Sequence, residues 1–116
     1  MKAINYEGKV FRMLSNEGPG DVDPETVFFY HQKDDYLWGH YEGGEVAVGV
    51  ILGRVHSDNT IEFDYRHFDK NGLLKGGHCS SHPEVIDGRI QLHEKWVWTK
   101  GSAGSGTSIL EEINDK

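Results

Sequence analysis

Residues that favour tight turns interrupt this sequence at short and regular intervals. The chain has 15 glycines but only 3 prolines. The turn candidates are Glu17-Gly18-Pro19-Gly20, Lys33-Asp34-Asp35, Gly43-Gly44, Ser57-Asp58-Asn59, Lys70-Asn71-Gly72, Asp87-Gly88 and Gly101–Gly106. Successive turns are roughly 8 to 16 residues apart, a spacing that suits β-hairpins and leaves little room for long helices.

The segments between these turns are rich in β-branched and aromatic residues, which favour strands. They are Gly8–Leu14, Thr26–Gln32, Tyr36–Tyr41, Glu45–Val55, Thr60–Phe68, Leu74–Ser81, Arg89–Lys100 and Thr107–Ile113. Apolar and polar residues alternate most clearly over 61–67 and 90–98, so each of these strands has an inward and an outward face. Helix signals are weak, and we allow one short helical turn at 23–25 or at 81–84.

About eight consecutive antiparallel strands leave two unpaired edges unless the sheet closes on itself, and about eight strands suffice for a small barrel. Five glycines inside the predicted strands favour closure, because residues without Cβ allow sharp bends and bulges. They are Gly39, Gly49, Gly53, Gly76 and Gly77. We predict an all-β, up-and-down meander closed into a small barrel, lipocalin-like (calycin-like) in architecture. A flatter sandwich is the alternative.

Length and charge restrict the class of protein. The 116 residues are enough for one domain, which we expect to span 1–116. A formal charge of −7 and the lack of long Lys or Arg runs argue against nucleic acid or an anionic membrane as partner. The sequence has no signal-like apolar start and no apolar run near the ~18 residues of a membrane helix, so we expect a cytoplasmic protein. The single cysteine, Cys79, fits a reducing compartment and leaves open only a disulfide between two chains.

The segment Leu92–Trp98 contains the most informative candidate site residue. Alternation places Glu94 on the same face as Leu92, Trp96 and Trp98. A carboxylate buried among aromatic rings needs a polar partner, because its burial without one is costly. Glu94 is therefore a candidate ligand anchor or general acid or base. The alternatives are a structural polar network, or a strand register that leaves Glu94 at the solvent-exposed rim.

Further polar residues share the predicted inward phase. Tyr41 follows Leu37 and Gly39 in this phase, and Tyr65 and His67 follow Ile61 and Phe63. Polar groups that converge in an apolar pocket orient a ligand; satisfaction by local hydrogen bonds is the alternative. The predicted ligand-binding residues are Tyr41, Tyr65, His67, Glu94, Trp96 and Trp98.

Three other patterns contain residue types that can carry chemistry. In a strand, His78 and His82 lie roughly 13 Å apart, too far to share one metal ion, and we predict no metal site and no cofactor. Cys79 has histidines nearby but no recognisable activating motif for a nucleophile. The Gly101–Ser108 segment lacks the Gly-Lys-Ser/Thr ending of a phosphate loop and is best interpreted as a hairpin connection.

The chain resembles a family of short, mostly uncharacterised bacterial proteins of about this length. The similarity lies in Asn5–Arg12, in Tyr41-Glu42-Gly43-Gly44-Glu45 followed by Gly49 and Gly53, in Leu92–Thr99 and in Gly106–Glu112. Members of this family often carry the name N-acetylglutamate synthase. That name implies transfer of an acetyl group from acetyl-CoA to glutamate. No catalytic residue can be assigned in this chain from the resemblance.

Three functions fit the sequence. The first, which we favour, is a small-molecule-binding barrel, lipocalin-like or avidin-like in architecture, without catalysis. The second is an enzyme, either the acetyltransferase or a barrel that uses Glu94 as a base. The third is a structural or interaction protein with a filled barrel, for which a homodimer that pairs through an edge strand or an outer face is one arrangement. The aromatic residues assigned to that outer face are Phe28, Tyr30, Tyr36 and Trp38.

Overall fold

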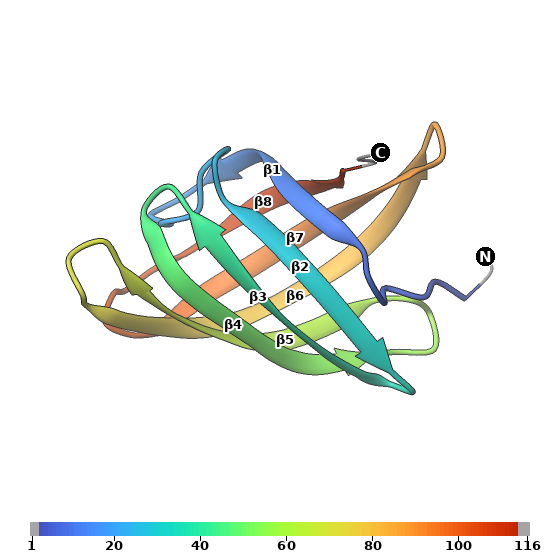
Figure 1. Ribbon diagram of the computed structural model, residues 1–116, viewed down its shortest axis with the longest axis horizontal. Helices are drawn as coiled ribbons and strands as arrows, with labels where there is room; N and C mark the ends of the chain where they lie inside the picture. The colour runs from blue at the N-terminus through green and yellow to red at the C-terminus, as the bar shows by residue number, and fades with distance from the viewer. Residues whose placement is uncertain (1–2, 114–116) are drawn as a thin grey trace.

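A computed structural model describes residues 3–113, which form a closed antiparallel barrel (Figure 1). Its strands are β1 (Val10–Glu17), β2 (Val27–Lys33), β3 (Tyr36–Gly43), β4 (Val46–Val55), β5 (Ile61–Asp69), β6 (Leu74–Ile86), β7 (Arg89–Lys100) and β8 (Ser105–Glu112). Each strand pairs with the next, and β8 pairs back to β1. The predicted all-β meander and its closure into a barrel are confirmed. None of the described residues forms a helix that could cross a membrane.

The turn residues form the predicted hairpins. At the β6–β7 hairpin, Asp87 and Gly88 have φ values of 52° and 79°. A two-residue turn with positive φ at both positions matches the right-handed twist of the flanking strands, and Asp-Gly favours it. Because consecutive strands run in opposite directions, the loops β1–β2, β3–β4, β5–β6 and β7–β8 lie at one end of the barrel. The other loops lie at the opposite end with the N-terminal segment (Figure 1).

Strand β6 extends beyond its predicted end at Ser81. It continues through Pro83 to Ile86, where we allowed a helical turn. Past Ser81 it pairs only with β7, with Pro83 opposite Leu92. The other side of this segment is a free edge. Proline is tolerated there because its missing N–H group would have no partner strand to bond. Residues 24–25, the second place where a helical turn was allowed, form a simple turn.

The outward assignment of Phe28 and Tyr30 was wrong. Both side chains are buried in the barrel, with exposed fractions of 6% and 0%. Val27 to Tyr30 are all apolar or aromatic, so alternation within β2 does not distinguish the two faces. Pairing with β3 decides, because Phe28 lies opposite Tyr41 and Tyr30 opposite Gly39. Tyr36 and Trp38 are exposed on the outer face, as predicted.

The two ends of the barrel are filled differently. At the end that holds the N-terminal segment, the buried Tyr6 side chain donates a hydrogen bond to the Asn59 carbonyl oxygen, at 2.8 Å. Phe11, Leu92 and Leu110 pack beneath it and are fully buried. The opposite end contains the polar and aromatic residues considered below.

A glycine makes room for one of these residues. Gly49 on β4 lies opposite Tyr41 on β3. A Cβ at position 49 would lie 2.5 Å from Cζ of the Tyr41 ring, a distance that is too short for any real contact. The ring therefore lies flat over the Gly49 backbone, and its hydroxyl group reaches β5. This is a close packing of backbone and side chain that only glycine permits.

Candidate functional site

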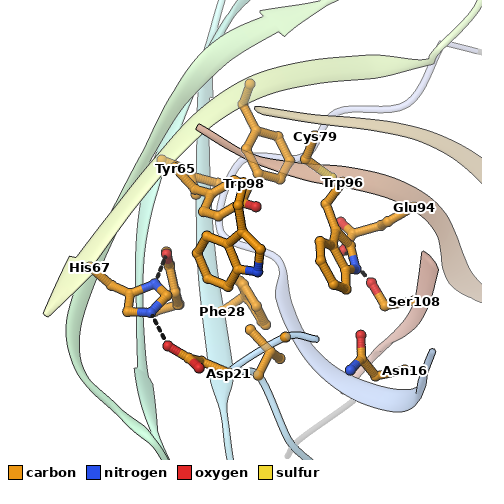
Figure 2. Close-up of a pocket in the computed structure, with 15 residues that line it drawn as sticks. Asn16, Asp21, Phe28, Tyr65, His67, Cys79, Glu94, Trp96, Trp98 and Ser108 are labelled. Atoms are coloured by element: carbon orange, nitrogen blue, oxygen red, sulfur yellow. Dashed lines mark hydrogen bonds and ion pairs between the residues drawn. The ribbon is translucent and has the colours of Figure 1, made fainter. Parts of the chain in front are cut away.

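A cavity of about 50 Å³ lies inside the barrel, below the β1–β2 loop. A cavity needs roughly 10–15 Å³ to hold one water molecule, so this one has room for a few atoms of a ligand. Its walls combine aromatic side chains with a small number of polar groups (Figure 2). The lining residues are Asn16, Gly20, Asp21, Val22, Phe28, Tyr41, Ile51, Phe63, Tyr65, His67, Cys79, Glu94, Trp96, Trp98 and Ser108.

The aromatic part of the wall comes mainly from β7. Its alternation places Glu94, Trp96 and Trp98 on the inner face in succession from the middle of the barrel to the β1–β2 loop. The two indole rings are 6.0 Å apart at 65°, and Tyr65 on β5 meets Trp98 at 5.6 Å and 67°. These edge-to-face contacts are the favourable geometry for aromatic rings, and they hold the wall in one arrangement.

A chain of hydrogen bonds joins β3, β5 and the β1–β2 loop at one side of the cavity. The Tyr41 hydroxyl lies 2.7 Å from Nδ1 of His67, and Nε2 of His67 lies 2.9 Å from the Asp21 carboxylate (Figure 2). A carboxylate only accepts, so Nε2 of His67 donates to Asp21, and the Tyr41 hydroxyl is the partner of Nδ1. Burial raises the pKa of Tyr41 well above its ordinary value, so its hydroxyl stays protonated.

The β1–β2 loop, residues 18–26, covers the cavity. Besides its contact with His67, Asp21 accepts two hydrogen bonds from Lys75 on β6, at 2.9 and 3.2 Å. The indole N–H of Trp98 donates to the Pro19 carbonyl oxygen at 2.6 Å. Because these bonds tie the loop to three different strands, the loop closes the cavity from above.

Glu94 is the most deeply buried acid of the cavity wall. Its side chain is only 7% exposed, and it accepts a hydrogen bond from Ser108 on β8 at 3.0 Å. Its second oxygen, Oε2, has no hydrogen-bond partner among the described residues. Burial raises the pKa of Glu94 to about 7, although the Ser108 hydroxyl and the Cys79 thiol oppose the rise by stabilising the carboxylate.

Two further polar atoms near Glu94 lack partners within the described part of the chain. They are the Tyr30 hydroxyl and Oγ of Ser81, both fully enclosed. Ser81 and Ser108 lie opposite Glu94 on the strands that flank β7. Burial raises the pKa of Tyr30, and the nearby Glu94 carboxylate raises it further. Buried polar atoms without partners are uncommon in proteins and call for an explanation.

Cys79 lines the same cavity and is 2% exposed. Burial and the neighbouring Glu94 raise the pKa of its thiol well above the ordinary value, so the reactive thiolate is suppressed. Its burial also keeps it from a disulfide with a second chain. Among residues 3–113, no group of three or more His, Cys, Asp or Glu side chains is arranged to hold a metal ion.

A second, more polar groove of about 630 Å³ is lined by exposed residues of β5, β6 and β7 and also borders Ser81, Glu94 and Ser108. Two of its exposed histidines are paired with glutamates, His56 with Glu62 at 3.0 Å and His93 with Glu84 at 2.9 Å. Enclosed cavities bury most of a small ligand, whereas an open polar groove does not. The interior cavity is therefore the better candidate site.

All six residues predicted from the sequence lie on the wall of the interior cavity: Tyr41, Tyr65, His67, Glu94, Trp96 and Trp98. Their role in ligand binding stays a prediction. Sequence reasoning missed Asp21, Val22 and Ser108. A usable signal for the first two was the length of the connection over residues 18–26, since hairpin loops usually have about 2–5 residues and longer ones often serve a function.

Comparison with known proteins adds the family. No curated protein and no solved structure gives a significant match to this chain. The family model described as avidin-like protein matches residues 4–113, which is nearly the whole sequence. An eight-stranded antiparallel barrel agrees with the avidin-like architecture expected from the sequence. The chain belongs to the avidin-like protein family.

Proposed function

We propose that this protein binds a small molecule inside the barrel, at the cavity below the β1–β2 loop. One observation carries the proposal: aromatic walls and buried polar groups converge on one cavity inside the barrel. Small-molecule sites in proteins typically have this composition, with a few polar groups that fix the orientation of the ligand. Membership of the avidin-like family supports the same class of function.

The size of the cavity limits the part of a ligand that fits without movement. About 50 Å³ admits a group of a few heavy atoms. A larger ligand requires the β1–β2 loop to move, because Asp21 and Val22 form the cover of the cavity. The tryptophans would then contact the apolar part of the ligand and Glu94 its polar end.

Native mass spectrometry of gently purified protein tests the proposal. We expect the protein to retain a stoichiometric small molecule, or to show a higher melting temperature with compounds from a fragment library. The substitution Val22→Phe, which fills the cavity from the loop, should abolish both effects. Val48→Phe is the matched control, because Val48 is 50% exposed on the outer face. Unchanged ligand binding in Val22→Phe would contradict the proposed site.

A second function is supported by the outer face of the barrel. Trp38 on β3 and Val50 and Leu52 on β4 are neighbours across paired strands and are 39%, 55% and 69% exposed. A cluster of large apolar side chains on the surface is typical of a protein interface. We infer that this face pairs with a second copy of the chain. Acetyl transfer to glutamate stays a prediction of the family resemblance alone.

A further inference from the structure

The free oxygen of Glu94 is the starting point. Among the described residues, Oε2 takes part in no salt bridge and no hydrogen bond. The Glu94 side chain is almost completely buried in the cavity wall. Leaving a buried acceptor without a donor costs about 1–3 kcal/mol, and more when the group is charged. A ligand that brings a donor to this point therefore removes a cost already present in the protein.

Among residues 3–113, no cationic side chain is paired with Glu94. The titratable groups that face it are Tyr30 on β2, Tyr41 on β3, Tyr65 on β5 and Cys79 on β6. Burial raises the pKa of each of them, and so all are neutral near pH 7. The ionised carboxylate consequently lacks a counter-ion in this part of the barrel.

The cationic side chains near the cavity are already engaged. Lys75 forms ion pairs with Asp21 at 2.9 Å and with Asp69 at 3.3 Å. His67, on the cavity wall, is hydrogen-bonded through both ring nitrogens, to Asp21 and to Tyr41. Neither group is therefore available as a counter-ion for Glu94.

The rings beside Glu94 can hold a cation. The face of an indole ring attracts a positive charge within about 6 Å of its centre, and tryptophan does so best among the aromatic side chains. One such contact is already present at the Trp98 ring, whose centre lies 5.8 Å from the Lys75 ammonium. Trp96, at 6.0 Å from Trp98, adds a second indole next to the carboxylate (Figure 2).

We propose that the cavity selects a small organic ammonium, which donates an N–H to Oε2 of Glu94 and rests against the indole rings of Trp96 and Trp98. This inference rests on the proposed function and names the chemical class of the ligand. An ammonium supplies both the missing donor and the missing counter-ion. A neutral amide supplies only the donor, and an alcohol of the same shape supplies a weaker one.

Three probes with the same branched four-carbon skeleton test the selection: isobutylammonium chloride, isobutyramide and isobutanol. Each is titrated into the full-length protein at pH 5 to 8, and binding is measured by calorimetry. We expect isobutylammonium to bind more tightly than the two neutral compounds at pH 8. Its affinity should rise about tenfold for each pH unit between 5 and 7, because only the ionised carboxylate pairs with it. The neutral compounds should show little change over this range.

Substitution of the carboxylate provides the second measurement. Glu94→Gln should weaken isobutylammonium binding at least about tenfold at pH 8 and leave isobutanol binding within about twofold. Glu62→Gln is the matched control, because it removes the same charge from a side chain that is 45% exposed on the outer face. For the unmodified protein, isobutylammonium should release close to one proton at pH 6, which is measured by repeating the titration in buffers of different ionisation enthalpy.

The outcomes separate this inference from the proposed function. Binding of isobutyramide or isobutanol as tightly as the ammonium overturns the choice of a cation and leaves a small-molecule site in place. Ammonium binding without proton release overturns the role of Glu94, even if the variant does not fold. Failure of all three probes, together with no retained molecule in native mass spectrometry, removes the small-molecule function itself.

Discussion

At the scale of single residues, Glu94 is the position where stability and binding conflict most directly. A carboxylate in a barrel core lowers stability once it ionises, because burial disfavours the charged form. Ser108 satisfies one oxygen and the other has no partner among the described residues. A core that served stability alone would favour an apolar side chain at this position. The carboxylate therefore fits a functional role better than a structural one.

The raised pKa of Glu94 predicts a specific dependence of stability on pH. Folding raises this pKa from 4.5 to about 7, so the folded state holds the proton more tightly than the unfolded chain. The stabilisation from the bound proton is complete below pH 4.5 and is lost as pH rises to about 7. Across this window the loss amounts to about 3 kcal/mol, since one pKa unit corresponds to about 1.4 kcal/mol.

Urea unfolding of the wild type and of Glu94→Gln between pH 4 and 8 measures this loss. The wild type should lose stability relative to the variant as pH rises, because glutamine does not ionise. Comparison with the variant subtracts the titration of the seven histidines, which are present in both proteins. A difference in the free energy of unfolding that stays constant from pH 4 to 8 would show that Glu94 titrates normally.

At the scale of elements, the β1–β2 loop controls access to the cavity. The other connections at this end of the barrel are short, whereas residues 18–26 form a cover above Trp96 and Trp98. Among the described residues, the side-chain hydrogen bonds between this cover and the strands are those of Asp21, of the Pro19 carbonyl and of Thr26, which donates to the Gly43 carbonyl oxygen. Loops held by a small number of bonds open at a lower free-energy cost than the strands beneath them.

Removal of the Asp21 carboxylate should open this cover. Asp21→Ala eliminates its hydrogen bonds with His67 and Lys75, each a charge-assisted bond of about 1.5–3 kcal/mol. We expect severalfold stronger acrylamide quenching of tryptophan fluorescence and faster amide exchange over residues 18–26. The measurement uses a Trp38→Phe background, because Trp38 is 39% exposed and would mask the buried indoles.

Asp64→Ala is the matched control for the loop. Asp64 is 78% exposed and pairs with His78 on the outer face, far in sequence from the loop. Its removal should leave quenching and exchange unchanged. Equal quenching in Asp21→Ala and in this control would mean that the Asp21 hydrogen bonds do not hold the loop closed.

At the scale of the whole molecule, charge and the apolar outer face act in opposite directions. A formal charge of −7 disfavours association of identical chains, while Trp38, Val50 and Leu52 favour it. Charged side chains flank these apolar residues: Arg54 lies over the Tyr36 ring at 5.5 Å, and Arg66 and Asp64 on β5 lie opposite Val50 and Leu52. An apolar centre with a charged border is the usual arrangement of an interface.

Analytical ultracentrifugation tests whether the outer face pairs with a second copy. We expect a reversible dimer whose dissociation constant rises by at least about tenfold in Leu52→Glu, because a charge would be buried at the centre of the interface. Val97→Glu introduces the same charge on β7, where Val97 is 42% exposed, and should leave the dimer intact. A wild-type protein that is monomeric at high concentration would exclude this interface.

Much of the fold could be predicted because its signals are local. Alternation over β5 and β7 assigned their inner and outer faces, and turn residues located the hairpins. Closure followed from strand number and interior glycines. The same reasoning failed for β2, where adjacent apolar residues hide the phase, and at Pro83, where the neighbouring strand has already ended. In both places the answer depends on pairing with another strand.

On strands with clear alternation, such as β5 and β7, the sequence by itself determined which residues point into the barrel, because a period of two is a property of the strand backbone. It also identified all six predicted site residues as inward-facing. Only the tertiary structure decided which of them meet. Tyr41, His67 and Asp21 join across two strands and a loop, and Asp21 lies 46 positions from His67. Such contacts depend on barrel closure and on strand register, which bring together residues that no local pattern relates.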